Sequence, residues 1–302
     1  MNVRRQALSN PVATWWALLT LVSGANIIFW FLLYRQLHAP APDAVGTSAQ
    51  TGSMLMLCAA YVFGCAFRSV LPRADVQRIC LYDSFLSSVF IGRSVATVAE
   101  ICFAAQWAII LSQLGGVAGA DTAVNAASII LPVIVIAEIC SWYAVLTTNF
   151  LFNAIENSLW AVTFAVIGIG LGRLIPEFEG VVRWLLIAGI IGIAFYLAFL
   201  VVVDVPMYLN RWRAGLADGS KYMRPLEGLR DVATRWVVTH EFDHWKDEIA
   251  WMSLYFSAAV WASLALCALS SFDDHLPRYR AQAAAASPAI VQSVHAQPVS
   301  VR

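Results

Sequence analysis

Seven long apolar stretches constrain this chain more than any other feature of its sequence. They cover residues 13–34, 52–71, 88–113, 124–146, 150–172, 181–203 and 249–271. A helix needs ~20 apolar residues to cross the hydrocarbon core of a bilayer, and lipid-exposed backbone is satisfied only in helices or closed barrels. The sequence therefore predicts an all-α integral membrane protein, a bundle of seven transmembrane helices.

The amino-acid composition supports this assignment. Hydrophobic residues make up 60% of the chain and charged residues 13%, whereas a soluble domain carries about 25% charged residues. This number of charged residues is too small to cover a water-facing surface. The excess of apolar residues therefore has to face lipid. The formal net charge is zero, which gives no attraction for nucleic acid as a partner.

The distribution of Lys and Arg among the loops predicts the orientation. With the N-terminus inside, twelve of these residues lie on the inner side and five on the outer side. Short cytoplasmic loops carry the excess of positive charge in membrane proteins. We therefore expect a cytoplasmic N-terminus and an outside C-terminus, in a plasma membrane such as the bacterial inner membrane.

The chain divides into a membrane domain and a C-terminal tail. Residues 1–280 are expected to form a single polytopic transmembrane domain. Within it, residues 204–248 are expected to form a basic, Trp-containing cytoplasmic loop, suited to lie along an anionic lipid surface. Residues 281–302 are rich in Ala, Ser, Pro and Val and are expected to form a disordered tail.

Three glutamates fall within the apolar stretches: Glu100, Glu138 and Glu156. A charge at the bilayer centre costs ~2.5–3.5 kcal/mol on insertion scales, and such residues usually face the bundle interior. Glu138 and Glu156 lie nine residues on either side of Thr147, the centre of the turn between two spans. At a rise of 1.5 Å per residue, all three glutamates lie roughly 12–13 Å from the cytoplasmic end. We therefore expect three carboxylates at one level.

Other polar residues share the helical faces of these glutamates. Arg93 precedes Glu100 by seven residues and lies on the same face. The fifth span carries three amides near Glu156, namely Asn149, Asn153 and Asn157. Such groups in a membrane helix either join helices by hydrogen bonds or form a site. The pattern predicts an intramembrane site that carries protons, holds a cation, or binds a lipid or amine headgroup.

A His-Glu-x-x-His string, from His240 to His244, precedes the last span. On a helix the two histidines share one face and together bind Zn²⁺ or Fe, while Glu241 polarises a bound water. The string resembles the zinc motif of the zincin metalloproteases. The alternative is a solvated helix start that anchors the chain at the interface through Trp245.

Seven helices with a His-x-x-x-His pair before the last one are also similar to the adiponectin-receptor and alkaline-ceramidase superfamily of zinc-dependent membrane amidases. In that family a further His and a Ser come from the second and third helices. The corresponding spans here contain no histidine. The third ligand would therefore have to be Asp83, Asp247 or Glu248.

Three functions remain open. The first is a small-solute or ion transporter, coupled to protons through the three glutamates. The second is a non-catalytic scaffold or accessory subunit, in which the polar residues join helices. The third is a metal-dependent enzyme that modifies lipid, with His240 and His244 as ligands. The expected partners are membrane lipid and other membrane proteins, or a second copy of the chain.

Overall fold

A computed structural model describes residues 10–38 and 49–270, so the predicted tail at 281–302 lies outside the described residues. Seven of its helices are long and apolar enough to cross a membrane. Five are single helices: α2 (Pro11–Leu37), α3 (Ala49–Val70), α4 (Val89–Ala118), α5 (Asp121–Thr147) and α6 (Phe150–Leu174). The sixth and seventh are each built from an α-helix, a π-helical turn and a second α-helix. The prediction of an all-α seven-helix bundle is confirmed.

The two composite helices carry their π-helical turns near the middle. The sixth consists of α7 (Gly180–Phe199), η3 (Leu200–Asp204) and α8 (Val205–Ala217). The seventh consists of α10 (Phe242–Leu254), η4 (Tyr255–Ala259) and α11 (Val260–Leu269). Single π turns inside helices are rare and are frequently found at functional sites.

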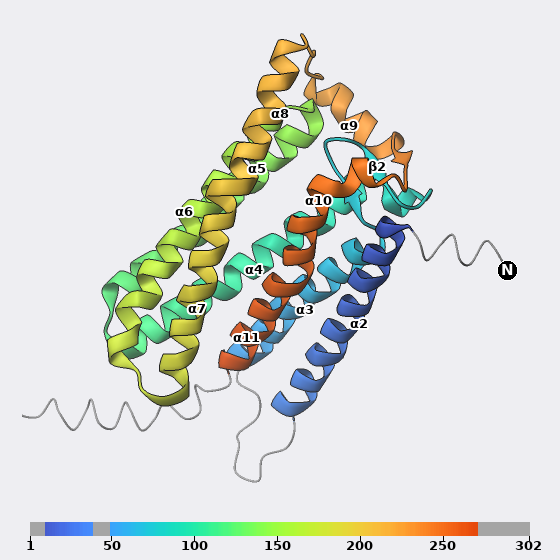
Figure 1. Ribbon diagram of the computed structural model, residues 1–302. Helices are drawn as coiled ribbons and strands as arrows, with labels where there is room; N and C mark the ends of the chain where they lie inside the picture. Colours follow the sequence, from blue (N-terminus) through green and yellow to red (C-terminus); the bar gives the residue numbers. More distant parts are fainter. Residues whose placement is uncertain (1–9, 39–48, 271–302) are drawn as a thin grey trace, which may run out of the picture.

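The helices are arranged around α4, as Figure 1 shows. On one side of α4 lies α5, followed by α6, and on the other side lies α3, followed by α2. The sixth helix packs on α6, and α11 packs on α3, α4 and α2. The bundle therefore has two groups of helices that share α4 as their common wall.

One end of the bundle carries a small sheet, and we call it the sheet end. Strand β1 (Arg73–Ala74) pairs antiparallel with β2 (Ile79–Cys80), which pairs parallel with β3 (Val237–Val238). The short helix α9 (Pro225–Thr234) lies at the same end (Figure 1). The start of α2 is also there, because the Asn10 amide donates a hydrogen bond of 3.2 Å to the His240 carbonyl.

Buried arginines hold the sheet end together. Arg78 Nε donates a hydrogen bond of 2.8 Å to Asp231 on α9. Its Nη2 donates one of 2.7 Å to the Val145 carbonyl near the end of α5. Arg73 lies against Gly92, where a Cβ would come within 2.1 Å of its guanidinium. Burial lowers the pKa of Arg73 to about 10, so this side chain is still cationic at neutral pH.

The sixth and seventh helices are longer than the apolar stretches that predicted them. The sixth continues past Asp204 to Ala217, with Pro206 just after the π-helical turn. The seventh begins at Phe242. The segment 204–248 is therefore mostly helical, with α8, α9 and the start of α10, and differs from the single loop that the sequence predicts.

Candidate functional site

A single guanidinium nitrogen joins the three intramembrane glutamates. Nη2 of Arg93 donates hydrogen bonds of 2.7 Å to Glu138 Oε2, 3.2 Å to Glu100 Oε2 and 3.4 Å to Glu156 Oε1. All four side chains are at least 91% buried. Hydrogen bonds between ionised groups are roughly twice as strong as neutral ones. We call these four residues the Arg93 cluster.

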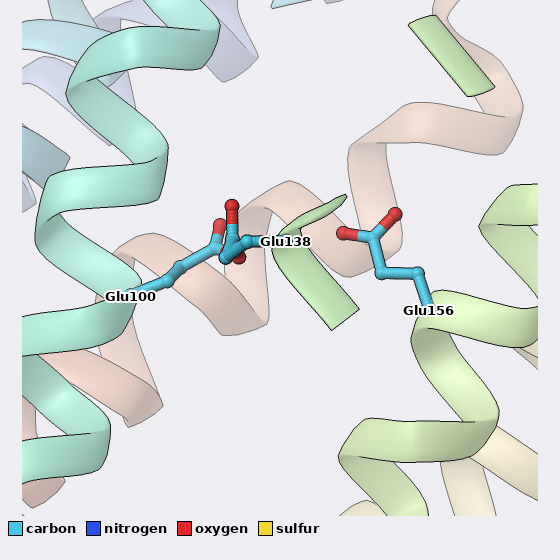
Figure 2. A group of neighbouring side chains, drawn as sticks. All are labelled: Glu100, Glu138 and Glu156. Atoms are coloured by element: carbon cyan, nitrogen blue, oxygen red, sulfur yellow. The ribbon is translucent and has the colours of Figure 1, made fainter. Parts of the chain in front are cut away.

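The cluster comes from three helices, α4, α5 and α6, whose glutamates point toward one another in Figure 2. One carboxylate oxygen from each glutamate lies within 4.8 Å of the others. The structure thus brings together the three glutamates that the sequence placed at one level. The tight turn between α5 and α6, where Thr148 adopts a left-handed φ of 57°, brings Glu138 and Glu156 to the same height.

Neutral side chains hold two of the carboxylates in place. Glu138 Oε2 accepts a hydrogen bond of 2.6 Å from Thr97, whose hydroxyl in turn accepts 3.0 Å from the Trp142 indole. Glu100 Oε1 accepts 2.9 Å from the Tyr255 hydroxyl. Tyr255 belongs to the π-helical turn η4, so the seventh helix also reaches the cluster.

The three asparagines have three different positions. Asn153 donates 3.2 Å from Nδ2 to Glu156 Oε2 and belongs to the cluster's surroundings. Asn149 lies outside it, because its side chain caps α6 by accepting 3.1 Å from the Leu151 amide. Asn157 is half-buried and lines the neighbouring cavity.

Several polar atoms around the cluster have no hydrogen-bond partner among the described residues. They are Arg93 Nε, Glu138 Oε1 and Asn153 Oδ1. An unsatisfied buried polar atom costs roughly 1–3 kcal/mol, so natural proteins seldom leave several together. Their grouping indicates room for water or for a polar ligand at this place.

The cluster borders a cavity of about 820 Å³. Its polar end is lined by Arg93, Glu100, Asn153 and Glu156, and further along it is apolar. Ligand pockets typically have volumes of ~300–1,000 Å³. The apolar walls come mainly from α4, α6, α7 and α11.

Asp204 is a fourth carboxylate at this cavity. It lies in the π-helical turn η3, lines the cavity and is only 6% exposed. Arg211 is a basic side chain whose charge attracts this carboxylate, and Arg211 is shared with Asp247 and Glu248. The two π-helical turns therefore each present a polar side chain to the cavity, Asp204 from the sixth helix and Tyr255 from the seventh.

The other carboxylates that line the cavity at the sheet end have basic partners. Asp75 lies 3.5 Å from Arg68, and Glu248 lies 3.0 Å from Arg211. The negative charge in excess of these pairs therefore lies at the Arg93 cluster and at Asp204.

The Arg93 cluster is the one group of three or more His, Cys, Asp or Glu side chains within residues 10–38 and 49–270 that is close enough to share a metal ion. The place where a cation would contact all three carboxylates is taken by Arg93 Nη2. A second cation there would repel the guanidinium. A metal ion held by all three carboxylates therefore requires Arg93 to move away, whereas Glu100 and Glu156 also line the cavity and can meet a cation there with Arg93 in place.

The histidine string does not form the helical pair that the sequence predicts. Helix α10 begins at Phe242, so His240 precedes the helix and does not share a helical face with His244. Both histidines are exposed. His244 Nδ1 lies 3.0 Å from the Thr239 hydroxyl. The expectation of a shared helical face was wrong because the helix starts two residues too late.

The three residues expected as a third metal ligand have other partners. Asp83 accepts 3.0 Å from the Trp236 indole, and Asp247 and Glu248 both bind Arg211. Each carboxylate is therefore held by a group that competes with a metal ion. The structure gives no support to zinc or iron at His240 and His244.

Thr97 and Tyr255 also contact the cluster, and neither is among the residues predicted from the sequence. Thr97 had a signal, because it lies four residues after Arg93 and three before Glu100 and so falls on their face. Tyr255 had none, because its direction depends on the π-helical turn.

Comparisons with protein-family models, curated proteins and solved structures give no significant match for this chain. The fold and the site define it as a polytopic helical membrane protein with a buried arginine–carboxylate cluster beside a cavity. Its function is therefore inferred from the geometry and charge of that site.

Proposed function

We propose that this protein is a membrane transporter that exchanges protons for a cationic solute at the Arg93 cluster. The observation that carries the proposal is the imbalance of charge at a buried site: three carboxylates share one guanidinium beside a cavity. When all four side chains are ionised, three negative charges face one positive charge, so the cluster has a net charge of −2. Uncompensated charge is expensive away from water, so protons or a cationic solute neutralise it.

Competition between the two kinds of cation gives a mechanism of coupling. A cationic solute that enters the cavity displaces protons from Glu100 and Glu156, and its departure allows protons to return. Arg93 holds the carboxylates together in both states. Asp204, at the other wall of the cavity, adds a negative charge on the path of the solute.

The scaffold function is less well supported, because polar contacts that only join helices look different in this chain. Ser263 donates a hydrogen bond of 2.6 Å to Gln106 Oε1, and Trp261 donates one of 3.0 Å to Asn26 Oδ1. Both pairs are neutral and matched, donor to acceptor. The Arg93 cluster has excess charge and several unpartnered atoms at a cavity, which joining helices does not require.

Transport is tested in proteoliposomes loaded with the pH dye pyranine. We expect outward- or inward-directed gradients of quaternary ammonium ions to change the internal pH, because these ions are permanently charged and do not cross lipid as neutral molecules. Glu156→Gln should abolish the signal, because it removes one exchangeable charge from the cluster. Glu179→Gln, at an exposed position outside the helices, is the matched control.

Two results would overturn the transport proposal. One is a proton signal in Glu156→Gln equal to that of the wild type. The other is the absence of any protein-dependent signal with short- and long-chain quaternary ammonium ions and with simple monovalent metal ions.

We also propose that the sheet end faces the cytoplasm and that the protein lies in the plasma membrane, as the excess of positive residues at that end favours. An impermeant maleimide should then label Glu179→Cys in intact cells and Ser220→Cys only after permeabilisation. These two positions are exposed and lie in different connections of the bundle. The six native cysteines are buried or half-buried and would be replaced first. Labelling of Ser220→Cys in intact cells would reverse the orientation.

A further inference from the structure

The cavity has a direction, from a charged end to a long apolar end. Apolar residues of α7 and α11 line it on opposite sides, among them Leu186, Ile193, Ala262 and Leu266. Phe103 and Ile110 of α4 line it as well. This apolar part gives a water-soluble ion nothing to bind. An alkyl chain would bury its surface there, at roughly 25 cal/mol for each Å² removed from water.

Several residues that line the cavity also lie on the outer surface of the bundle. Phe195 of the sixth helix is 75% exposed, and Trp261 of the seventh is 53% exposed. In a membrane these side chains face lipid. The cavity therefore opens sideways between the sixth and seventh helices, which Figure 1 shows as separate columns.

The charged end favours a positive headgroup. The Arg93 cluster and Asp204 together set four carboxylates against one guanidinium. The Asp204 carboxylate is buried, and Arg211, which attracts it, is shared with Asp247 and Glu248, so negative charge remains in excess there. A phosphate or carboxylate headgroup would be repelled here.

Aromatic rings surround the same end. The Tyr255 hydroxyl donates a hydrogen bond to Glu100, and the Tyr61 ring lies 6.0 Å from that of Tyr255. Tyr196, Tyr208, Trp160 and Trp251 also line the cavity. Ring faces attract cations, and such aromatic surroundings are the usual way to bind quaternary ammonium groups. Carboxylates combined with rings thus favour an alkylated ammonium over a small metal ion.

We infer, resting on the transport function proposed above, that the substrate is a single-chain amphiphile with a cationic ammonium headgroup, which enters from the bilayer between the sixth and seventh helices. The headgroup lies between the Arg93 cluster and Asp204. The alkyl chain lies along α7 and α11. A neutral or anionic amphiphile of the same length lacks the attraction of the carboxylates.

The inference is tested by equilibrium binding, without any gradient. Tritiated hexadecyltrimethylammonium, at trace concentration, is bound to the protein in phosphatidylcholine nanodiscs and counted by scintillation proximity. We expect saturable binding for which hexadecanol, palmitate and tetramethylammonium compete at least about tenfold less well than the unlabelled amphiphile, since each lacks the charge or the chain.

Two variants locate the site. Gly192→Trp places a ring in the apolar part of the cavity, at a position where a Cβ meets no other atom within 4 Å, and should weaken binding at least about tenfold. Gly116→Trp is the control, because this helical position also has nothing within 4 Å and does not line the cavity. Asp204→Asn should weaken binding of the cationic amphiphile and leave that of hexadecanol unchanged.

Equal competition by hexadecanol or palmitate would show a groove for any bilayer chain and would overturn the inference. Binding that Gly192→Trp and Asp204→Asn leave unchanged would place the site elsewhere and overturn it too. Failure of the two proposals is distinguishable. If the protein binds the cationic amphiphile specifically but moves no protons in proteoliposomes, the ligand class stands and the transport proposal is refuted. If tetramethylammonium moves protons and the amphiphile does not, the transport proposal stands and the amphiphile inference is refuted.

Discussion

Arg93→Ala is expected to destabilise this protein more than any other single substitution at the site. The change leaves three carboxylates buried within 4.8 Å of one another with no positive charge between them. Removing one partner from a buried ionic network costs about 3–5 kcal/mol, because the remaining charge is left uncompensated. We expect a large fall in the thermal unfolding temperature in detergent and a loss of monodisperse protein on size-exclusion chromatography.

Two further variants identify the cause of this loss. Arg173→Ala removes an exposed arginine at the end of α6 and should have little effect on stability. Arg93→Gln combined with Glu138→Gln removes one charge of each sign and should recover part of the stability lost in Arg93→Ala. If Arg93→Ala unfolds at the same temperature as Arg173→Ala, the Arg93 cluster does not hold α4, α5 and α6 together.

The main features of the bundle were predictable because they depend on local properties of the chain. Apolar length alone predicts seven spanning helices. The level of the glutamates followed from a constant rise per residue and from the position of the α5–α6 turn. Arg93 shares a helical face with Glu100, so their contact of 3.2 Å was also within reach of the sequence.

The features that were not predictable depend on tertiary structure. Nothing in the composition of residues 200–204 or 255–259 indicates a π-helical turn, yet these turns direct Asp204 and Tyr255 into the cavity. The start of α10 at Phe242 separates His240 from His244, although the string has the spacing of a metal motif. A motif of five residues predicts a site only if the helix that carries it begins early enough.

The sharpest distinction between helix joining and transport comes from removing the excess charge while the ion pair is kept. Glu100→Gln combined with Glu156→Gln leaves Arg93 with Glu138, its partner at 2.7 Å, so the cluster becomes neutral. We expect this double variant to be at least as stable as the wild type by thermal unfolding, because neutral amides replace uncompensated buried carboxylates. We expect its proton signal in proteoliposomes to fall to that of protein-free vesicles.

The opposite result would point to the scaffold function. If the double variant is much less stable than the wild type, all three carboxylates are required to join the helices, and the excess charge has a structural role. Ser263→Ala is the matched control, because it removes a neutral hydrogen bond of 2.6 Å to Gln106, does not line the cavity and leaves the charge of the cluster unchanged. A stable double variant without transport, beside an active Ser263→Ala, would mean that the second and third carboxylates are kept for the cations they exchange.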